Sequence, residues 1–160
     1  MNWRGILGTA ILSFAGSVLV AGSASAQPAS GDGAIKAANQ AFYVALSARD
    51  VKAMEAVWAN KPYVVNIGPR DTTVRVGYAD AVSNYWPKTF ALISRMSVTL
   101  TSIAQLRTDG KLAWVVGTEN AVIQLKNGGA PVKFRTFFTN VFEKEGARWL
   151  MVSHHAQPIP

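Results

Sequence analysis

Apolar residues in the first half of the chain recur at helical spacing. In residues 34–49 one face collects the apolar side chains, while lysine, glutamine and serine lie on the other. Asp50 is a suitable N-cap for a second short helix directly after it. A third helical pattern covers residues 78–93, and Pro87 inside it predicts a kink or break near Trp86. These segments predict three helices.

The rest of the pattern has the period-two alternation of β-strands. The expected strands cover residues 63–67, 74–76, 96–107, 112–125, 132–142 and 148–156. In the first long strand, alternation places one face on Met96, Val98, Leu100, Ser102, Ala104 and Leu106. Helices followed by a four-stranded meander indicate an α+β fold. Because long strands twist, we expect a cone-shaped, curved antiparallel sheet wrapped over three N-terminal helices, enclosing an apolar pocket.

The N-terminal segment resembles a secretory signal peptide. Residues 1–26 begin with one positive charge, continue as an apolar run and end in Ala24-Ser25-Ala26, which predicts cleavage after Ala26. Residues 27–33 are expected to form a flexible tail, and residues 34–157 a single domain. The mature protein is therefore expected in the periplasm or outside the cell, without a membrane anchor.

Composition and motif content argue against several kinds of chemistry and partner. The 160 residues include no cysteine, which excludes disulfides and thiolate chemistry. The net charge of +7 comes from scattered lysines and arginines, so we expect no nucleic-acid partner. The sequence has no phosphate-binding loop, no metal-ligand spacing and no nucleophile triad order, so neither a cofactor nor a metal is expected.

Several motifs resemble the nuclear transport factor 2-like superfamily, in its SnoaL-like and ketosteroid-isomerase-like branch. These are residues 42–46 with Arg49-Asp50, then Gly77 to Val82 leading to Trp86, and finally residues 149–155. The resemblance covers approximately residues 34–157 and implies a cystatin-like α+β fold. It does not imply one activity, because the superfamily contains isomerases, cyclases, dehydratases, ligand binders and oligomerisation modules.

The resemblance to ketosteroid isomerases points to two positions. The carboxylate base of that family falls on Asn66, and an amide cannot accept a proton at neutral pH. The tyrosine that donates to the oxyanion is nearest to Tyr43, although the matched position itself holds Phe42. Asn66 either faces a cavity or is a solvated strand residue, and Tyr43 is either an oxyanion donor or part of the core edge.

The chain is also similar to the association domain of calmodulin-dependent kinase, whose two pocket arginines fall on Asn120 and Asn140. Amides in place of these cations argue against a carboxylate ligand. Alternation favours Asn120 pointing inward and Glu119 outward. If the register slips by one residue, Glu119 instead lies inside and becomes the obvious base.

Adjacent histidines on the last strand must point to opposite faces, so they do not form a shared metal site. Alternation places His155 with Trp149, Met151 and Ser153, and His155 matches the last histidine of the resembled family. The resemblance implies a hydrogen-bonding group or general base in the pocket, and the alternative is a structural histidine near the C-terminus. His155 and Tyr43 are thus the catalytic candidates. The expected ligand-binding residues are Tyr43, Asn66, Trp86, Asn120, Phe138, Asn140 and His155.

Three functions fit this pattern. The first is a binder of a small, largely apolar, neutral ligand in the cone pocket. The second is an isomerase or lyase acting next to a carbonyl, with His155 or Glu119 as base. The third is a dimeric scaffold that pairs through the outer sheet face, for which Val115, Ala121, Ile123 and Val141 are the expected outward apolar residues. A homodimer is compatible with all three.

Overall fold

The computed structural model describes residues 31–160, so the expected signal peptide and residues 27–30 of the tail lie outside the described residues. Helix α1 (Gly31–Ala48) begins inside the segment expected as tail. Asp50 caps α2 (Val51–Val57), accepting a 2.9 Å hydrogen bond from the Ala53 backbone N–H. The predicted N-cap is therefore confirmed.

The third helical segment is broken, as Pro87 predicts. A short π-helical turn, η1 (Ala79–Ser83), is separated by Asn84 from α3 (Tyr85–Ala91). Pro87 lies in the first turn of α3, where the missing N–H leaves no intrahelical bond unmade. The break thus precedes the proline by a few residues.

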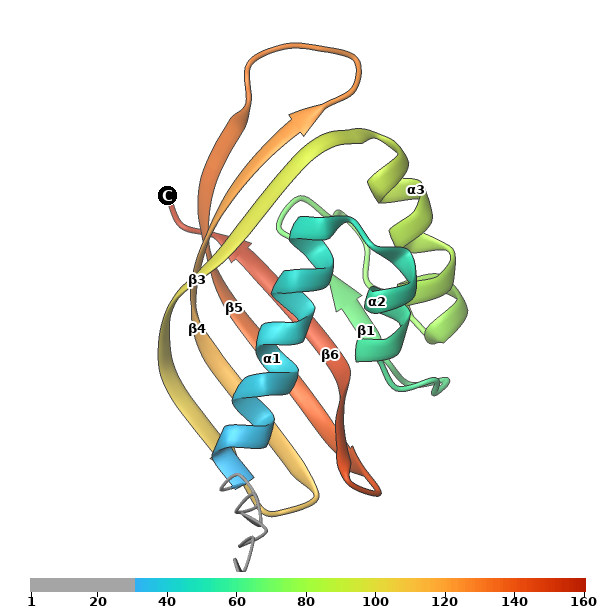
Figure 1. Ribbon diagram of the computed structural model, residues 1–160, viewed down its shortest axis with the longest axis vertical. Coiled ribbons are helices and arrows are strands. Elements are labelled where there is room, and N and C mark those ends of the chain that lie inside the picture. The colour runs from blue at the N-terminus through green and yellow to red at the C-terminus, as the bar shows by residue number, and fades with distance from the viewer. Residues whose placement is uncertain (1–30) are drawn as a thin grey trace, which may run out of the picture.

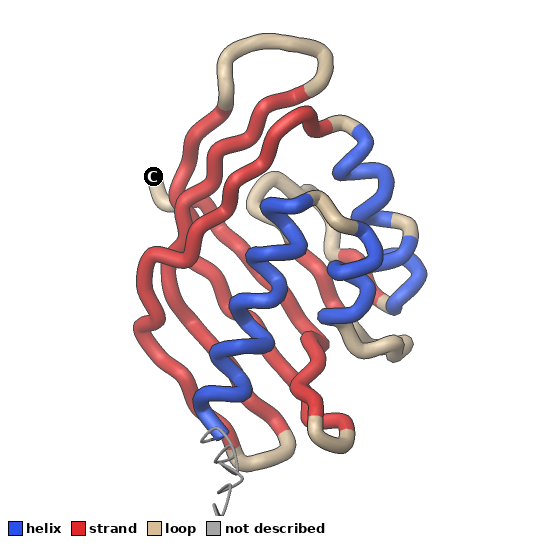
Figure 2. The backbone as a smooth tube through the Cα atoms, in the orientation of Figure 1, coloured by secondary structure: helices blue, strands red, loops and turns tan. Residues whose placement is uncertain are grey.

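Six strands form one mostly antiparallel sheet in the order β2-β1-β6-β5-β4-β3, in which only the β1–β6 pair is parallel. The strands are β1 (Val65–Ile67), β2 (Arg75–Val76), β3 (Ile93–Thr108), β4 (Leu112–Leu125), β5 (Val132–Glu145) and β6 (Arg148–Pro158). The sheet curves, and the helices lie against one of its faces (Figures 1 and 2). The predicted α+β architecture is confirmed.

A cluster of aromatic rings fills the space between helices and sheet. The Phe42 ring lies 5.5 Å from Tyr43, 6.4 Å from Trp58 and 6.1 Å from Trp86 between centroids, all in edge-on geometry. Phe138 on β5 joins this cluster through Tyr43 at 5.8 Å. Edge-on contacts of this kind stabilise aromatic pairs beyond the burial of their area.

The predicted inward face of β4 is wrong by one residue. Val115, Glu119 and Ala121 are buried under the helices, whereas Asn120 is exposed. At Gly117 the inward face of β4 has no room for a side chain, since an added Cβ would lie 2.0 Å from the Ser102 carbonyl oxygen and 2.9 Å from Phe138. Apolar residues occupy both faces of β4, so alternation alone did not distinguish them.

Register shifts explain the other reversed faces. On β3 the pairing with β4 shifts at Leu100/Ser102 and again at Ile103/Gln105, so Ile103 packs against the core in place of Ser102 and Ala104. On β6 the register passes from Met151 to Ser153 without pairing Val152. A β-bulge switches the face of every later residue.

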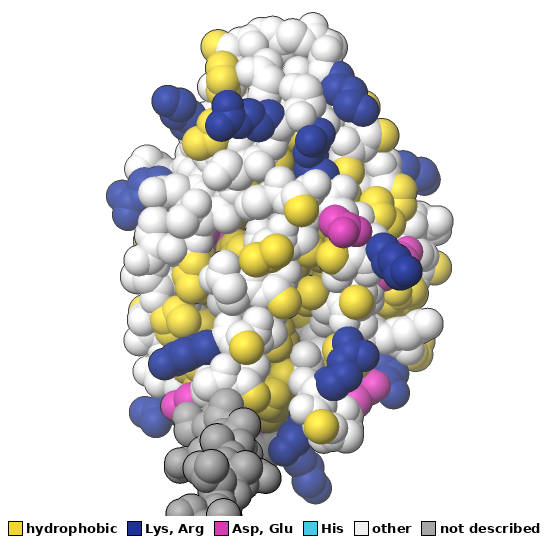
Figure 3. All heavy atoms as spheres, viewed as in Figure 1, with side chains coloured by type: hydrophobic (Ala, Val, Ile, Leu, Met, Phe, Trp, Pro, Cys, Tyr) yellow, Lys and Arg dark blue, Asp and Glu magenta, His cyan; other side chains and the backbone are white. Residues whose placement is uncertain are grey.

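The described surface carries its charges in a scattered arrangement. Lysine and arginine side chains are spread over the visible face rather than gathered in one patch (Figure 3). Among the described residues, no helix is long and apolar enough to cross a membrane.

Candidate functional site

A pocket of about 160 Å³ opens between the curved sheet and the helices. Its wall is mainly apolar and comes from α1, α3, β3, β4, β5, β6 and the turn at residues 68–71. The apolar residues that line it are Leu46, Pro69, Trp86, Ile93, Met96, Val98, Ala121, Ile123 and Phe134. A closed apolar cavity of similar volume in another protein binds benzene, so this pocket has room for about one six-membered ring.

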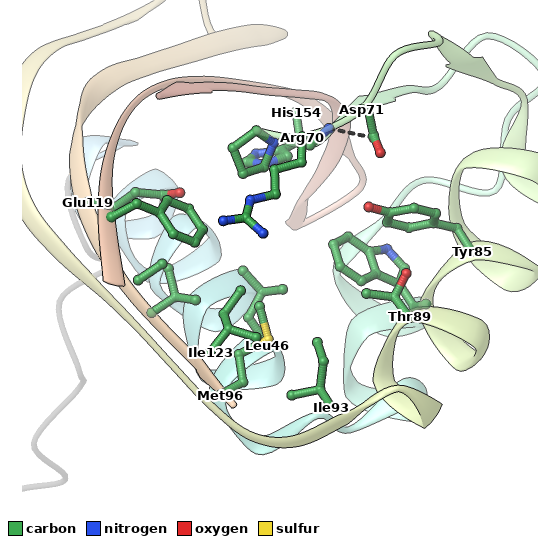
Figure 4. Close-up of a pocket in the computed structure, with 16 residues that line it drawn as sticks. Leu46, Arg70, Asp71, Tyr85, Thr89, Ile93, Met96, Glu119, Ile123 and His154 are labelled. Atoms are coloured by element: carbon green, nitrogen blue, oxygen red, sulfur yellow. Dashed lines mark hydrogen bonds between the residues drawn. The ribbon is translucent and has the colours of Figure 1, made fainter. Parts of the chain in front are cut away.

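Two buried polar side chains line the pocket, Glu119 from β4 and His154 from β6 (Figure 4). Each is only 4% exposed. Buried ionisable groups in a largely apolar pocket are typical of functional sites.

Glu119 has one oxygen bound and one free. Oε1 accepts a 2.8 Å hydrogen bond from the Thr136 hydroxyl, its partner across β4 and β5, while Oε2 is buried without a hydrogen bond among the described residues. Burial raises the pKa of the Glu119 carboxyl, an effect that the Thr136 and Tyr43 hydroxyls oppose. The carboxyl therefore takes up a proton more readily than an exposed glutamate does.

His154 is held by an amide. Its Nδ1 lies 2.7 Å from the Asn140 Oδ1, and the Asn140 amide donates to Asn39 Oδ1 at 2.8 Å. The imidazole also packs against the Phe42 ring, 4.7 Å between centroids. Burial, with a smaller contribution from His155, lowers the pKa of His154 to about 3. The ring is therefore neutral at physiological pH.

Tyr43 lies behind the pocket wall rather than in it. Its hydroxyl is buried close to Glu119 and Asn140, but makes no hydrogen bond of standard geometry with either. Burial, followed by the nearby Glu119 charge, raises the pKa of the phenol, which keeps its proton. The hydroxyl is accordingly placed to act on Glu119 rather than on a molecule in the pocket.

A connected group of side chains shapes the pocket mouth. Asp71 Oδ2 accepts from the Gly68 backbone N–H at 2.7 Å and forms an ion pair with Arg75 at 2.8 Å. The Arg75 guanidinium stacks on the Tyr85 ring, 4.4 Å from its centroid. Arg70 extends into the pocket opening, with its guanidinium 5.5 Å from the centre of the Phe134 ring (Figure 4).

Only some of the residues expected at the site line the pocket. Asn66, Phe138 and Asn140 are buried but do not line the pocket, and Trp86 does. The Asn66 amide donates to the Ala81 carbonyl oxygen at 3.0 Å, which ties β1 to η1. Asn66 is thus inside the protein, but its NH₂ group is used by the fold.

Two expected positions lie on the wrong side of the sheet. Asn120 and His155 are exposed, so the prediction that they point into the pocket is wrong. The unpaired Val152 moves His154 inward in place of His155, and the actual register of β4 moves Glu119 inward in place of Asn120. The alternative register considered from the sequence is the correct one for Glu119.

Arg70, Asp71, Tyr85 and His154 line the pocket and were not among the expected residues. The turn that carries Arg70 and Asp71 was identified only as a turn. No periodic signal reports where a turn residue points, so alternation could not find them. Among residues 31–160, no cluster of three or more acidic or histidine side chains could hold a metal ion.

The fold and the pocket define an α+β protein of the nuclear transport factor 2-like class. A family model described as "SnoaL-like domain" matches residues 35–159, and the chain belongs to that family. A comparison with curated proteins gives no match.

Solved structures agree on the class. A proposed dehydratase of the nuclear transport factor 2-like family from Streptomyces avermitilis is 26% identical, with a TM-score of 0.70 over 79% of this chain and 94% of the other. A proposed calcium/calmodulin-dependent protein kinase type II association domain from Thiobacillus denitrificans is 29% identical, with a TM-score of 0.64 over 78% and 94%. A proposed scytalone dehydratase from Novosphingobium aromaticivorans shares the fold at 10% identity, with a TM-score of 0.70 over 79% and 83%.

Proposed function

We propose that this protein binds a small, largely apolar, neutral molecule in the pocket between helices and sheet. The observation that carries the proposal is the pocket itself, about 160 Å³, with apolar walls and the buried Glu119 and His154. The walls favour an apolar body, and the two polar groups fix its orientation. A cation would lose its hydration in such a site, and burial raises the pKa of Glu119, which favours the neutral form of the one buried carboxyl among residues 31–160 that lines it.

A pocket-filling variant tests the binding. The protein is purified gently and examined by native mass spectrometry for a retained molecule, and toluene is titrated in with NMR detection. Ile123→Trp places a large side chain at the wall, whereas Val44→Trp adds the same side chain at an exposed position of α1. We expect Ile123→Trp to lose both the retained mass and the toluene response, and Val44→Trp to keep them. Equal binding by both variants contradicts the proposal.

A second candidate is proton transfer by an isomerase or lyase next to a carbonyl group. The observation that favours it is the free Oε2 of Glu119, a buried carboxyl with a raised pKa at a pocket wall. A carboxyl with a raised pKa is a stronger base than an exposed glutamate, which suits proton transfer. The 26% identity to a protein described as a proposed dehydratase supports the same class.

Hydrogen exchange at carbon tests this candidate without knowledge of the substrate. Cyclohexanone is incubated in D₂O with the protein, and loss of its α-proton signals is followed by NMR. We expect the wild type to accelerate the exchange and Glu119→Gln to abolish the acceleration while still binding cyclohexanone. Exchange that is unchanged by Glu119→Gln removes Glu119 as the base.

We also propose that the mature protein is exported and forms a homodimer. The signal-like pattern of residues 1–26 supports export. Expression in a Gram-negative host should therefore yield a periplasmic chain beginning at Gln27, and Ala26→Lys should block this cleavage. Side chains exposed on the outer face of β4 and β5, with Trp114 44% and Phe137 52% exposed, support pairing through the sheet.

A further inference from the structure

A chain of buried amides fixes the state of the pocket histidine. Asn39 on α1, Asn140 on β5 and His154 on β6 are hydrogen-bonded in series, at 2.8 and 2.7 Å. Asn39 and Asn140 are fully buried, so no water competes for these bonds. The side chain of Asn140 is therefore held between two partners.

The direction of the first bond determines the second. Asn140 donates its amide NH₂ to Asn39 Oδ1, which leaves Asn140 Oδ1 facing His154 Nδ1. A carbonyl oxygen only accepts, so the imidazole must carry its proton on Nδ1. A neutral imidazole has one N–H, and Nε2 is then an acceptor.

No described residue hydrogen-bonds Nε2. Asn140 takes the Nδ1 edge and does not itself line the pocket, while His154 does. The nitrogen available to a molecule in the pocket is consequently Nε2, with its lone pair. A bound molecule satisfies this acceptor only if it brings a hydrogen-bond donor.

We infer that the molecule bound in this pocket is an alcohol or phenol whose hydroxyl donates to Nε2 of His154, with Asn140 and Asn39 as the positioning residues. This rests on the proposed binding function and specifies the ligand class. The single hydroxyl proton goes to Nε2, and the hydroxyl oxygen is then free to accept a hydrogen bond from the Glu119 carboxyl when that carboxyl carries a proton. A ketone only accepts and leaves Nε2 unpaired. A protonated amine also donates, but it brings a charge into the pocket, and burial raises the pKa of Glu119, the only described carboxyl buried in its wall, which favours the neutral form of that partner.

The tautomer is measured directly. In protein labelled with ¹⁵N-histidine, long-range proton–nitrogen correlation spectra distinguish the Nδ1–H from the Nε2–H form of His154. We expect Nδ1–H, with an unprotonated Nε2, in the unliganded wild type at pH 7. An Nε2–H tautomer would overturn the inference, without any variant having to fold.

Ligand preference provides the second measurement. Cyclohexanol, cyclohexanone and cyclohexylamine are similar in size and differ in the polar group. We expect wild type to bind cyclohexanol about 10-fold more tightly than cyclohexanone, the value of one hydrogen bond. Asn140→Leu removes the acceptor at Nδ1, permits Nε2–H and should shift the preference toward cyclohexanone. Asn140→Asp places a carboxylate beside the ring, which favours the imidazolium with a proton on both nitrogens, so it should also shift the preference toward cyclohexanone.

The outcomes distinguish failure of the hydroxyl assignment from failure of the proposed binding function. Equal binding of alcohol and ketone by the wild type, or tightest binding of the amine, overturns the hydroxyl assignment while the pocket stays a binding site. An unchanged preference in a folded Asn140→Leu overturns the positioning role. If none of these probes, nor toluene, shifts the pocket signals, the proposed binding function fails, and the ligand assignment with it.

Discussion

The carboxylate of Glu119 on β4 accepts a 2.8 Å hydrogen bond from Thr136, which lies directly opposite it on β5. The bond holds one oxygen, and the other has no partner among the described residues. Glu119 thus has one hydrogen-bonded oxygen and one unsatisfied oxygen in a buried position, which affects stability as well as chemistry.

Glu119→Gln should stabilise the protein at high pH. A carboxyl whose pKa is higher in the folded than in the unfolded state contributes stability that is full below its ordinary pKa, here 4.5. That contribution is lost as the pH rises through the folded-state pKa. We expect Glu119→Gln to exceed the wild type by about 1–3 kcal/mol in unfolding free energy at pH 8, from relief of a buried unsatisfied charge.

Urea denaturation at pH 4 and pH 8 measures this difference. At pH 4 both side chains are neutral in the folded state, so the advantage should largely vanish. Glu55→Gln on α2 is the control, because Glu55 keeps contact with water. A stabilisation by Glu119→Gln that is equal at the two pH values would contradict the argument.

Helix positions and the order of elements follow from the sequence because they depend on local signals. The Asp50 cap and the Pro87 break each act within one or two turns. Asn66 and Asn140 were identified through the resemblance to known families, which left their burial open, and both are fully buried. The cap and the break require no knowledge of how one strand is paired with another.

The composition of the pocket depends on register, which local patterns do not determine. His154 replaces His155 because Val152 is unpaired in the bulge of β6, and nothing in the sequence around Val152 marks a bulge. Glu119 replaces Asn120 because β4 is apolar on both faces. Tertiary packing, rather than alternation, determines the inward face there.

Gly117→Ala tests that packing directly. A Cβ at this position would lie 2.0 Å from the backbone carbonyl oxygen of Ser102, which cannot move without disturbing β3. We expect a loss of about 3 kcal/mol in unfolding free energy, the upper end of the usual cost of overpacking. Gly31→Ala at the start of α1 is the matched control, since an added Cβ there meets nothing within 4 Å.

Thermal and urea unfolding of the two alanine variants should therefore diverge. Gly31→Ala should be neutral or slightly stabilising, because alanine favours helix over the unfolded chain. If Gly117→Ala were as stable as Gly31→Ala, the close approach of β3 to β4 would not be a requirement of the curved sheet.

Asp71→Ala should weaken binding at the pocket through the shape of its mouth. Asp71 joins the Gly68 backbone to Arg75, and Arg75 stacks on Tyr85. Without the carboxylate, the turn at residues 68–71 loses a backbone hydrogen bond and an ion pair. We expect about 3- to 10-fold weaker cyclohexanol binding, corresponding to the loss of one such interaction.

Titration with NMR detection compares Asp71→Ala with Asp80→Ala, an exposed position on η1 outside this pocket. Asp80→Ala should bind as the wild type does. Faster backbone hydrogen exchange at residues 68–71 should accompany the loss of affinity in Asp71→Ala. Unchanged affinity with faster exchange would show that the turn does not shape the binding site.

Substitution on the outer sheet face tests the proposed dimer. Trp114 and Phe137 are 44% and 52% exposed, and β-pairing places Phe137 beside Thr118 on the same outward face as Trp114. A charge at the centre of an apolar interface loses its hydration on pairing, so Phe137→Glu should yield a monomer at micromolar concentration. Val44→Glu, at the exposed and apolar Val44 of α1, is the control and should stay dimeric. Native mass spectrometry decides between the two states, and a dimeric Phe137→Glu or a monomeric wild type would exclude pairing through this face.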